Sequence, residues 1–288
     1  MSAMRTLVTG ACCAWPLPTD ASCARAARQF YREAAAEAGI RAGLIDDGVL
    51  MASELAANTL HAGRDIGGRD RFRPVTPRPE LWLYLRGSGM MRELVCKVFD
   101  ACPGWRLGRI PGTLPHRAAV DAVSGRGLQV VHELSRGRWG HHLTRARLGG
   151  RKVRGKAVWF ALPVPSRGVT APAHGLRDTW AADLNAARQC RRLSARQAAT
   201  ELEAMLSARG LGGRLLRADP AAADISVLWV PRGLTVCCRD GTVSLRTAAG
   251  HSQHWTYADL VEVTERAVWI HEEIGHTVAG AAGAEAAG

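Results

Sequence analysis

The chain has 288 residues, of which 47% are apolar, so it is long enough to bury one large hydrophobic core or two smaller ones. It contains no apolar run long enough to cross a bilayer, which excludes an ordinary transmembrane helix. The net charge of +12 is uneven, because residues 1–182 carry +13 (27 Lys and Arg against 14 Asp and Glu) and residues 183–288 carry −1 (11 against 12).

Eight cysteines occur without a C-x-x-C motif or a regular spacing, a pattern typical of reduced thiols. Residues 1–21 lack the charged, apolar and small-residue regions of a secretory signal. We therefore expect a cytoplasmic protein without a membrane partner. The basic excess of the first part would suit a polyphosphate, an acidic protein or a nucleic acid.

The first predicted elements are a short strand over residues 5–8 and a helix over residues 21–38. Thr19 or Asp20 suits the N-cap of this helix, and Gly39 suits its end.

A second helix is predicted over residues 46–62, with Gly63 as its C-terminal cap and a surface loop over residues 64–79. Read at the helical period, one stripe of this helix is polar and consists of Asp47, Glu54, Asn58 and His61. Glu54 and Asn58 lie one turn apart on one face, so they can serve one bound group together. Such a stripe is more often a solvated face, and the rest of the chain must decide between the two interpretations.

A β-hairpin is predicted next, with strands over residues 81–85 and 94–99 joined through residues 86–89. Asp100 ends the second strand. Residues 101–124 are rich in Pro, Gly and Arg, which predicts either a lid or binding loop or a disordered segment.

The segment Gly125-Arg126-Gly127-Leu128 opens a third helix, and two more strands are predicted over residues 139–144 and 153–162. Two prolines then end this part of the chain. We therefore expect four regions: a first domain over residues 1–165, a linker over 166–192, a small α+β module over 193–275 and a disordered Ala/Gly-rich tail over 276–288.

In the second module, Ser194 and Gln197 form a capping box for a helix that ends at Ala208. A last helix begins after Thr256 and ends at Glu273. Between them, a small antiparallel meander is predicted, with strands over residues 225–230, 234–239 and 242–246 and turns at 231–233 and 240–241.

Three motifs follow one another in the first domain: Glu-x-x-x-Asn at Glu54 and Asn58, a hairpin ending at Asp100 with Gly104 four residues later, and Gly-x-Gly at Gly125 and Gly127 opening a helix. This order resembles the GHKL (Bergerat-fold) ATPases, which include gyrase, histidine kinases and the anti-sigma-factor serine kinases. The segments that look most like the anti-sigma kinase branch are residues 53–62, 125–131, 138–140 and 155–160. The resemblance implies an α+β two-layer sandwich with a mixed sheet and helices on one face, followed by the small C-terminal α+β module.

The resemblance also implies a site for ATP and Mg²⁺. Mg²⁺ prefers oxygen ligands and usually takes few protein groups, so the side-chain oxygen of Asn58 would be its ligand. Glu54 would act as a general base, and Asp100 corresponds to the aspartate that accepts the adenine amine. The other nucleotide-binding residues that the resemblance implies are His61, Gly104, Gly125, Arg126, Gly127 and Leu128.

The leading hypothesis is an ATP-binding regulatory protein that resembles the anti-sigma-factor serine/threonine kinases. It would either phosphorylate a serine of a partner, such as a sigma factor or an anti-sigma antagonist, or use ATP to gate that interaction. Either form of the hypothesis allows a homodimer. The alternative is a non-catalytic interaction module with a degenerate nucleotide site, because Cys102 replaces the first glycine of the family's Asp-x-Gly-x-Gly motif. Nucleic-acid binding ranks last, since neither an aromatic platform nor a reading helix is evident in the basic module.

Other motifs carry less weight. Residues 150–156 nearly match a Walker A loop, but Ala157 replaces the Ser or Thr that would bind magnesium, and a strand follows. His271 and His276 are five residues apart, about 140° around a helix, which does not suit a zinc helix. His132 lies after the Gly-x-Gly motif, not where a phospho-acceptor histidine stands. Adjacent strand residues point to opposite faces, which argues against two paired metal sites: His141-His142 and Cys237-Cys238.

Overall fold

The chain forms two compact units, Met1–Asp183 and Leu184–Gly288. The computed structural model describes residues 7, 10–67, 78–87, 91–102, 126–149, 152–164, 193–212, 214–216 and 224–285. Each unit has its own hydrophobic core. The predicted linker over residues 166–192 lies outside the described residues.

The first unit contains a five-stranded sheet in which every pair of neighbouring strands is antiparallel. Its strands are, in spatial order, β1 (Cys12–Pro16), β2 (Glu80–Arg86), β3 (Glu93–Asp100), β5 (Arg154–Pro163) and β4 (Trp139–Arg145). The predicted mixed sheet is therefore wrong for the described strands. That prediction came from the resemblance alone, whereas the predicted hairpin, β2 with β3, is antiparallel as expected, and β4 and β5 also pair with each other antiparallel.

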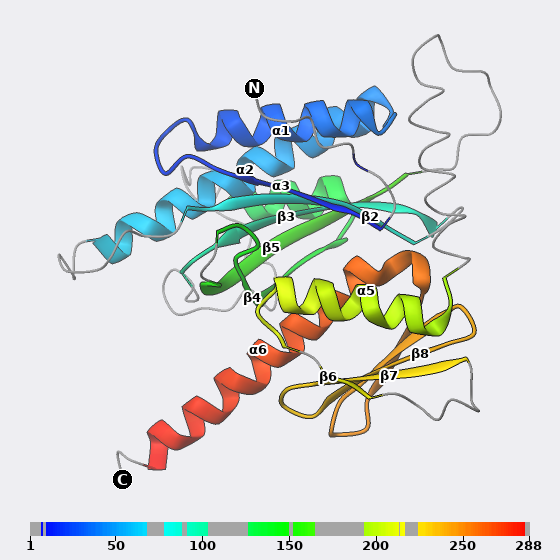
Figure 1. Cartoon of the computed structure of the whole chain (residues 1–288). Coiled ribbons are helices and arrows are strands. Elements are labelled where there is room, and N and C mark those ends of the chain that lie inside the picture. Colours follow the sequence, from blue (N-terminus) through cyan, green and yellow to red (C-terminus); the bar gives the residue numbers. More distant parts are fainter. Residues whose placement is uncertain are drawn as a thin grey trace, which may run out of the picture. The chain divides into compact units, whose positions relative to one another are not determined.

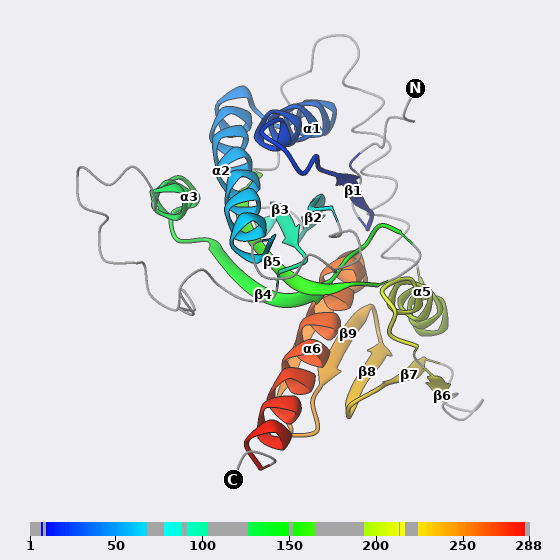
Figure 2. The same ribbon diagram turned by 90° about the vertical axis from the view of Figure 1, so that its left-hand side faces the viewer.

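Three helices, α1 (Cys23–Glu37), α2 (Ala42–Gly67) and α3 (Gly127–Ser135), cover one face of this sheet (Figures 1 and 2). Their apolar side chains share one core with alternate residues of the strands, including Leu83, Cys96 and Phe160. The prediction of helices on one face is confirmed. The fold is α+β, as expected.

The ends of α1 and α2 differ in how well the sequence predicted them. Gly39, with φ +70°, ends α1 as expected, and its N–H donates to the carbonyl of Ala36. Gly63, by contrast, does not cap α2, which continues to Gly67. A glycine inside a helix costs only about 1 kcal/mol, so it does not by itself end one.

Helices α1 and α2 approach closely at Gly48. A Cβ at this position would lie 2.0 Å from the hydroxyl oxygen of Tyr31, so the glycine makes room for the tyrosine ring. Tyr31 is fully buried, and burial raises the pKa of its phenol well above the usual range. This contact fixes the spacing of the two helices over the sheet.

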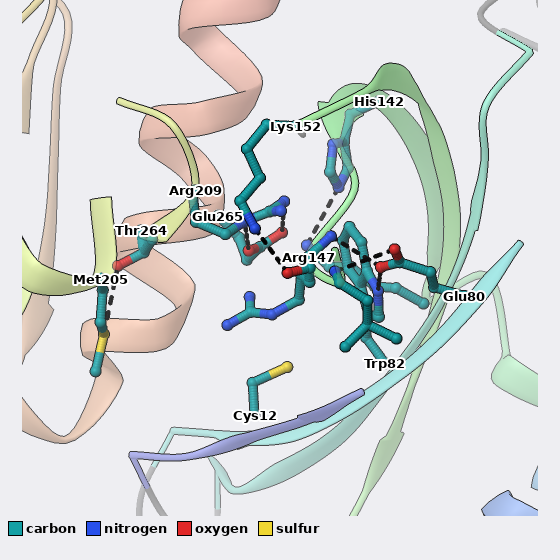
Figure 3. Close-up of polar contacts among 12 residues, drawn as sticks. Cys12, Glu80, Trp82, His142, Arg147, Lys152, Met205, Arg209, Thr264 and Glu265 are labelled. Carbon is teal, nitrogen blue, oxygen red and sulfur yellow. Dashed lines mark hydrogen bonds and ion pairs between the residues drawn. The ribbon is translucent and has the colours of Figure 1, made fainter. Parts of the chain in front are cut away.

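On the opposite face of the sheet, Glu80 anchors the segment between β4 and β5. Its carboxylate accepts hydrogen bonds from the Nε1–H of Trp82 and the backbone N–H of Arg147, both at 2.8 Å, and from the N–H of Leu148 at 3.1 Å (Figure 3). Lys152 donates to the Arg147 carbonyl at 2.9 Å (Figure 3). The segment is thereby held over the stacked rings of Trp82 and Phe99.

The second unit contains a separate five-stranded antiparallel sheet. Its strands are, in spatial order, β10 (Ser252–Thr256), β9 (Thr242–Arg246), β8 (Leu234–Arg239), β7 (Ile225–Val230) and β6 (Arg214–Leu216). The predicted meander over β7, β8 and β9 is confirmed residue for residue, whereas β6 and β10 were not predicted. Asp240 and Gly241, with φ +49° and +76°, make the tight turn between β8 and β9.

Helices α5 (Ala195–Ala208) and α6 (Leu260–Glu285) share one core with alternate residues of this second sheet, and a single 3₁₀ turn, η3 (Tyr257–Asp259), precedes α6. The capping box of Ser194 and Gln197 is confirmed at the start of α5. The predicted disorder from residue 276 is wrong as far as Glu285, because α6 continues through Gly275 and the alanine-rich segment favours a helix. None of the helices in the described ranges combines the length and apolarity that a bilayer span requires.

A buried ion pair joins α6 to the end of α5. The guanidinium of Arg209 donates to the carboxylate of Glu265 at 3.0 Å through Nε, and both side chains are at most 2% exposed (Figure 3). The hydroxyl of Thr264 contacts the sulfur of Met205 at 3.6 Å beside it (Figure 3). These contacts hold the two helices of the second unit together.

Candidate functional site

The polar stripe of α2 is oriented by the apolar residues on the rest of the helix. Met51, Ala52 and Leu55 are buried in the first core. As a result, Glu54 is only partly buried and Asn58 is exposed. The predicted carboxylate and amide therefore both reach the surface of the helix on the same side.

The start of α3 lies directly against these two residues. A Cβ on Gly127 would be 2.7 Å from Oε2 of Glu54 and 3.7 Å from Nδ2 of Asn58. Segments about seventy residues apart in the sequence thus meet at one place, as the resemblance implied. Since Gly127 carries no side chain, the backbone at the start of α3 can approach the Glu54 carboxylate closely.

The first turn of α3 offers hydrogen-bond donors beside this contact. The N-cap residue, Arg126, is exposed and makes no side-chain capping hydrogen bond within the described part of the chain. Uncapped N–H groups at a helix start favour a bound anion, and the Arg126 guanidinium adds positive charge. Leu128, predicted as part of the same motif, instead packs against the first core and anchors the helix.

Asp100 lies at the end of β3, as predicted, but it already has a partner. Its Oδ2 is 2.7 Å from Nζ of Lys156 on β5, and its Oδ1 accepts the N–H of Cys102 at 2.9 Å. Asp100 and Lys156 are directly opposite in the β3–β5 register. Strand alternation places both on the same face as Val98, the face that the helices cover.

Lys156 was not predicted as a partner of Asp100. It appeared only as the last residue of the rejected Walker-like segment. Lys156 could have been found by pairing the predicted strands β3 and β5, because in the correct register Asp100 lies directly opposite Lys156. Gly155 beside it is required by close packing, since a Cβ there would lie 2.2 Å from the Asp100 carbonyl oxygen.

Part of the predicted site falls outside the described residues. Gly104 and Gly125 belong to this part, and so does the side chain of His61, although its backbone continues α2. The described residues therefore form two groups on the helix-covered side of the sheet. The first is Glu54, Asn58 and Gly127, and the second is Asp100 with Lys156.

The buried thiols of this layer are poor nucleophiles. Burial raises the pKa of Cys23, which approaches the hydroxyl of Thr59 at 3.9 Å, and raises that of Cys96 well above its usual range. Both thiols therefore stay protonated at neutral pH. Neither thiol is activated by the described residues around it, so neither is a candidate nucleophile.

The secondary motifs have structural roles in the described ranges. Nδ1 of His132 accepts the indole N–H of Trp139 at 3.0 Å, which ties α3 to β4. Gly275, which follows the predicted helix end at Glu273, lies within α6 under the guanidinium of Arg232, which donates to the His271 carbonyl. Among the described residues, no group of three or more His, Cys, Asp and Glu side chains is arranged to hold a metal ion. That finding does not bear on a magnesium ion held by Asn58 and phosphates.

Comparison of the sequence with protein-family models and with curated proteins finds no match to this chain.

Proposed function

We propose that the first unit binds Mg-ATP between α2 and α3 and acts as a regulatory protein of the anti-sigma serine/threonine kinase type. The observation that carries the proposal is the contact of Gly127 with Glu54 and Asn58, at 2.7 and 3.7 Å from its Cβ position. The residues there fit the nucleotide, since the bare backbone of Gly127 meets the side-chain amide of Asn58 and the carboxylate of Glu54 beside the exposed Arg126.

Each side chain has a distinct role in this proposal. The Asn58 side-chain oxygen would hold Mg²⁺, which neutralises the phosphates when bound. The N–H groups of the first α3 turn and the Arg126 guanidinium would orient the phosphates. Glu54 would accept the proton of a serine hydroxyl of the partner while the oxygen attacks the γ-phosphorus and ADP leaves.

Calorimetry with Mg-ATP tests the binding step. Asn58→Ala should weaken Mg-dependent binding by more than about tenfold, because it removes a ligand of the metal. Glu33→Gln, an exposed change on α1, is the matched control and should bind like the wild type. Absence of binding by the wild type, or unchanged binding by Asn58→Ala, would refute the proposal.

A transfer assay with radiolabelled ATP and co-purified partner proteins tests the chemistry. Glu54→Gln should retain nucleotide binding but lose transfer to a partner serine, because the amide cannot accept the proton. Glu33→Gln again serves as the control. Binding without transfer in the wild type would instead indicate that ATP gates the interaction.

A second candidate function is a non-catalytic interaction module, and one observation favours it. Both oxygens of the Asp100 carboxylate already accept hydrogen bonds, from Lys156 and from the N–H of Cys102. An adenine amine would have to share this carboxylate. Retention of partner binding by Glu54→Ala in the absence of ATP would support this candidate over the kinase.

A further inference from the structure

The sheet of the second unit has two unlike faces. The helix-covered face is built from apolar side chains such as Leu228, Val236 and Leu245, all at most 1% exposed. The strand register identifies the residues that point to the opposite face on strands β7 to β10. Its residues are Ile225, Val227, Trp229, Thr235, Cys237, Arg239, Thr242, Ser244, Arg246, Ser252, His254 and Thr256, and none of them is buried. We call this set the open sheet face.

Charge in the second unit is divided between the sheet and the helices. The five strands contain three arginines and no Asp or Glu. The helical segments α5, η3 and α6 contain two arginines and eight acidic residues: Glu201, Glu203, Asp259, Glu262, Glu265, Glu272, Glu273 and Glu285. The net charge of −1 for residues 183–288 therefore hides a sheet that is cationic on its own. The arginines of the open sheet face are Arg239 and Arg246, so an anionic partner is the complement of that face.

Trp229 stands on this face with 54% of its surface exposed. In the strand register it lies in one row with Thr235 on β8, Arg246 on β9 and Ser252 on β10. Neighbouring strands are about 4.8 Å apart, so Arg246 lies about 10 Å from Trp229 across the sheet. A planar apolar ring and a guanidinium at this separation suit a ligand that alternates flat rings with negative charges.

The second cation of the face, Arg239, is accessible to such a ligand. It pairs with Asp240 in the adjoining turn at 3.1 Å, but both side chains are about two-thirds exposed (64% and 66%). Exposed pairs of this kind are weak and are readily exchanged for another anion. Hydroxyl groups of Thr235, Ser244 and Ser252 lie on the same face and can donate hydrogen bonds to the ligand.

An apolar partner fits the face less well. Exposed large hydrophobic residues of the described chain are Leu50, Met91 and Trp229, so Trp229 is isolated within its unit. A stable contact between two copies needs a contiguous apolar centre, which the surrounding arginine, serine and threonine side chains do not provide.

We propose that the open sheet face binds single-stranded nucleic acid, with a base stacked on Trp229 and phosphates at Arg246 and Arg239. Any base can stack on an aromatic ring, and arginines on a sheet can contact successive phosphates of an extended nucleic-acid strand. A duplex hides its bases from a flat platform, so the single-stranded form is the one recognised. This inference does not depend on nucleotide binding by the first unit.

The test measures binding of the full chain to fluorescently labelled oligo(dT) and oligo(U) of about twelve nucleotides, a length within the usual range of single-strand sites. The basic first unit can contribute non-specific affinity, so the readout is the difference between variants. Trp229→Ala should weaken binding at least about fivefold, whereas Trp229→Phe, which keeps a stacking ring, should stay near the wild type. Both substitutions are at an exposed position, and circular dichroism checks the fold.

Salt dependence tests the cations. The slope of log K against log[salt] is negative, and Arg246→Ala should make it less steep by about 0.7, the contribution of one single-strand phosphate contact. Arg196→Ala, an exposed change on the acidic α5, is the matched control and should leave the slope unchanged.

Three outcomes would overturn the proposal. The first is equal binding by Trp229→Ala and the wild type, and the second is tighter binding of duplex than of single strand. The third is loss of self-association in Trp229→Ala, measured by gel filtration, which would make this face a contact between copies of the chain. Heparin is a polyanion without bases, so it should displace the oligonucleotide from the wild type no more readily than from Trp229→Ala.

Discussion

The carboxylate of Glu54 lies against Gly127, so that a methyl group on this glycine would come within 2.7 Å of Oε2. Real Cβ atoms do not approach an oxygen this closely, and one of the two groups must move. The carboxylate is the end of a flexible side chain, whereas Gly127 is fixed in the first turn of α3. A change at Gly127 is therefore a change in the position of Glu54.

Gly127→Ala should accordingly separate stability from function. Alanine stabilises a helix by up to about 1 kcal/mol relative to glycine, so the melting temperature should be unchanged or slightly higher. Displacement of the Glu54 carboxylate should lower phosphoryl transfer by about tenfold or more, since misplacement of a catalytic group by about 1 Å can cost a factor of 100. Gly43→Ala is the matched control, because a Cβ at Gly43 meets no atom within 4 Å. Equal transfer rates for the two variants would contradict the role that we propose for Glu54.

The ion pair between Asp100 and Lys156 predicts a large loss of stability when one partner is removed. The side chains are 13% and 6% exposed, so Lys156→Met would leave a carboxylate largely buried without its cation. Breaking a buried pair in this way costs about 3–5 kcal/mol, and the measurement is urea-induced unfolding. The double variant Asp100→Asn with Lys156→Met should recover part of the loss. Arg239→Ala, which breaks the exposed pair with Asp240, should cost less than about 1 kcal/mol.

A third prediction about the first unit concerns the carboxylate of Glu80. Its carboxylate receives three N–H donors, from Trp82, Arg147 and Leu148. Glu80→Gln replaces one acceptor oxygen with an NH₂ group that faces these donors, at a cost of about 1–3 kcal/mol. Hydrogen exchange should accelerate most at the amides of Arg147 and Leu148. Glu93→Gln, on the neighbouring strand, is the control and should leave these two amides unchanged.

The elements that the sequence predicted best are those defined by neighbours in the chain. The strands of the meander alternate buried and open residues, and its turns contain Arg232-Gly233 and Asp240-Gly241, which adopt positive φ angles. The capping box at Ser194 is equally local. In each case two or three adjacent residues determine the conformation, so a single sequence is sufficient.

The features that the sequence did not predict depend on interactions between distant segments of the chain. Strand β1 has the sequence Cys-Cys-Ala-Trp-Pro, without β-branched residues, and its strand conformation depends on pairing with β2. The pairing of Asp100 with Lys156 depends on the register of β3 and β5, which no local motif encodes. The open sheet face was missed because exposure of Trp229 follows from where α5 and α6 pack, not from the composition of β7. Of the candidate site, the residues on helices were found, whereas the partner of Asp100 was not.

The last prediction concerns the pH dependence of stability in the second unit. Cys238 is fully buried, and burial raises the pKa of its thiol from 9.0 to about 12, with the neighbouring Cys237 acting in the same direction. The folded state therefore keeps the thiol protonated at a pH where the unfolded chain has lost the proton. Because the unfolded state binds fewer protons above pH 9, the free energy of unfolding should fall as the pH rises from about 9 towards about 12.

Urea titrations at about pH 8 and about pH 9.7 would measure this loss, with Cys238→Ala as the test variant. Tyr257 also has its pKa raised by burial, to about 12, but from a usual value of 10.0, so within the second unit the lower part of the pH range reports mainly on the Cys238 thiol. The buried thiols Cys23 and Cys96 of the first unit are present in both the wild type and the variant, so the difference between the two isolates Cys238. The variant should be less stable at pH 8, because it leaves a small cavity in the core, yet it should lose less stability between the two pH values. Cys237→Ala, at the partly exposed neighbouring position, should keep most of the wild-type dependence. If Cys238→Ala and the wild type lose the same amount, ionisation of this buried thiol is not the cause.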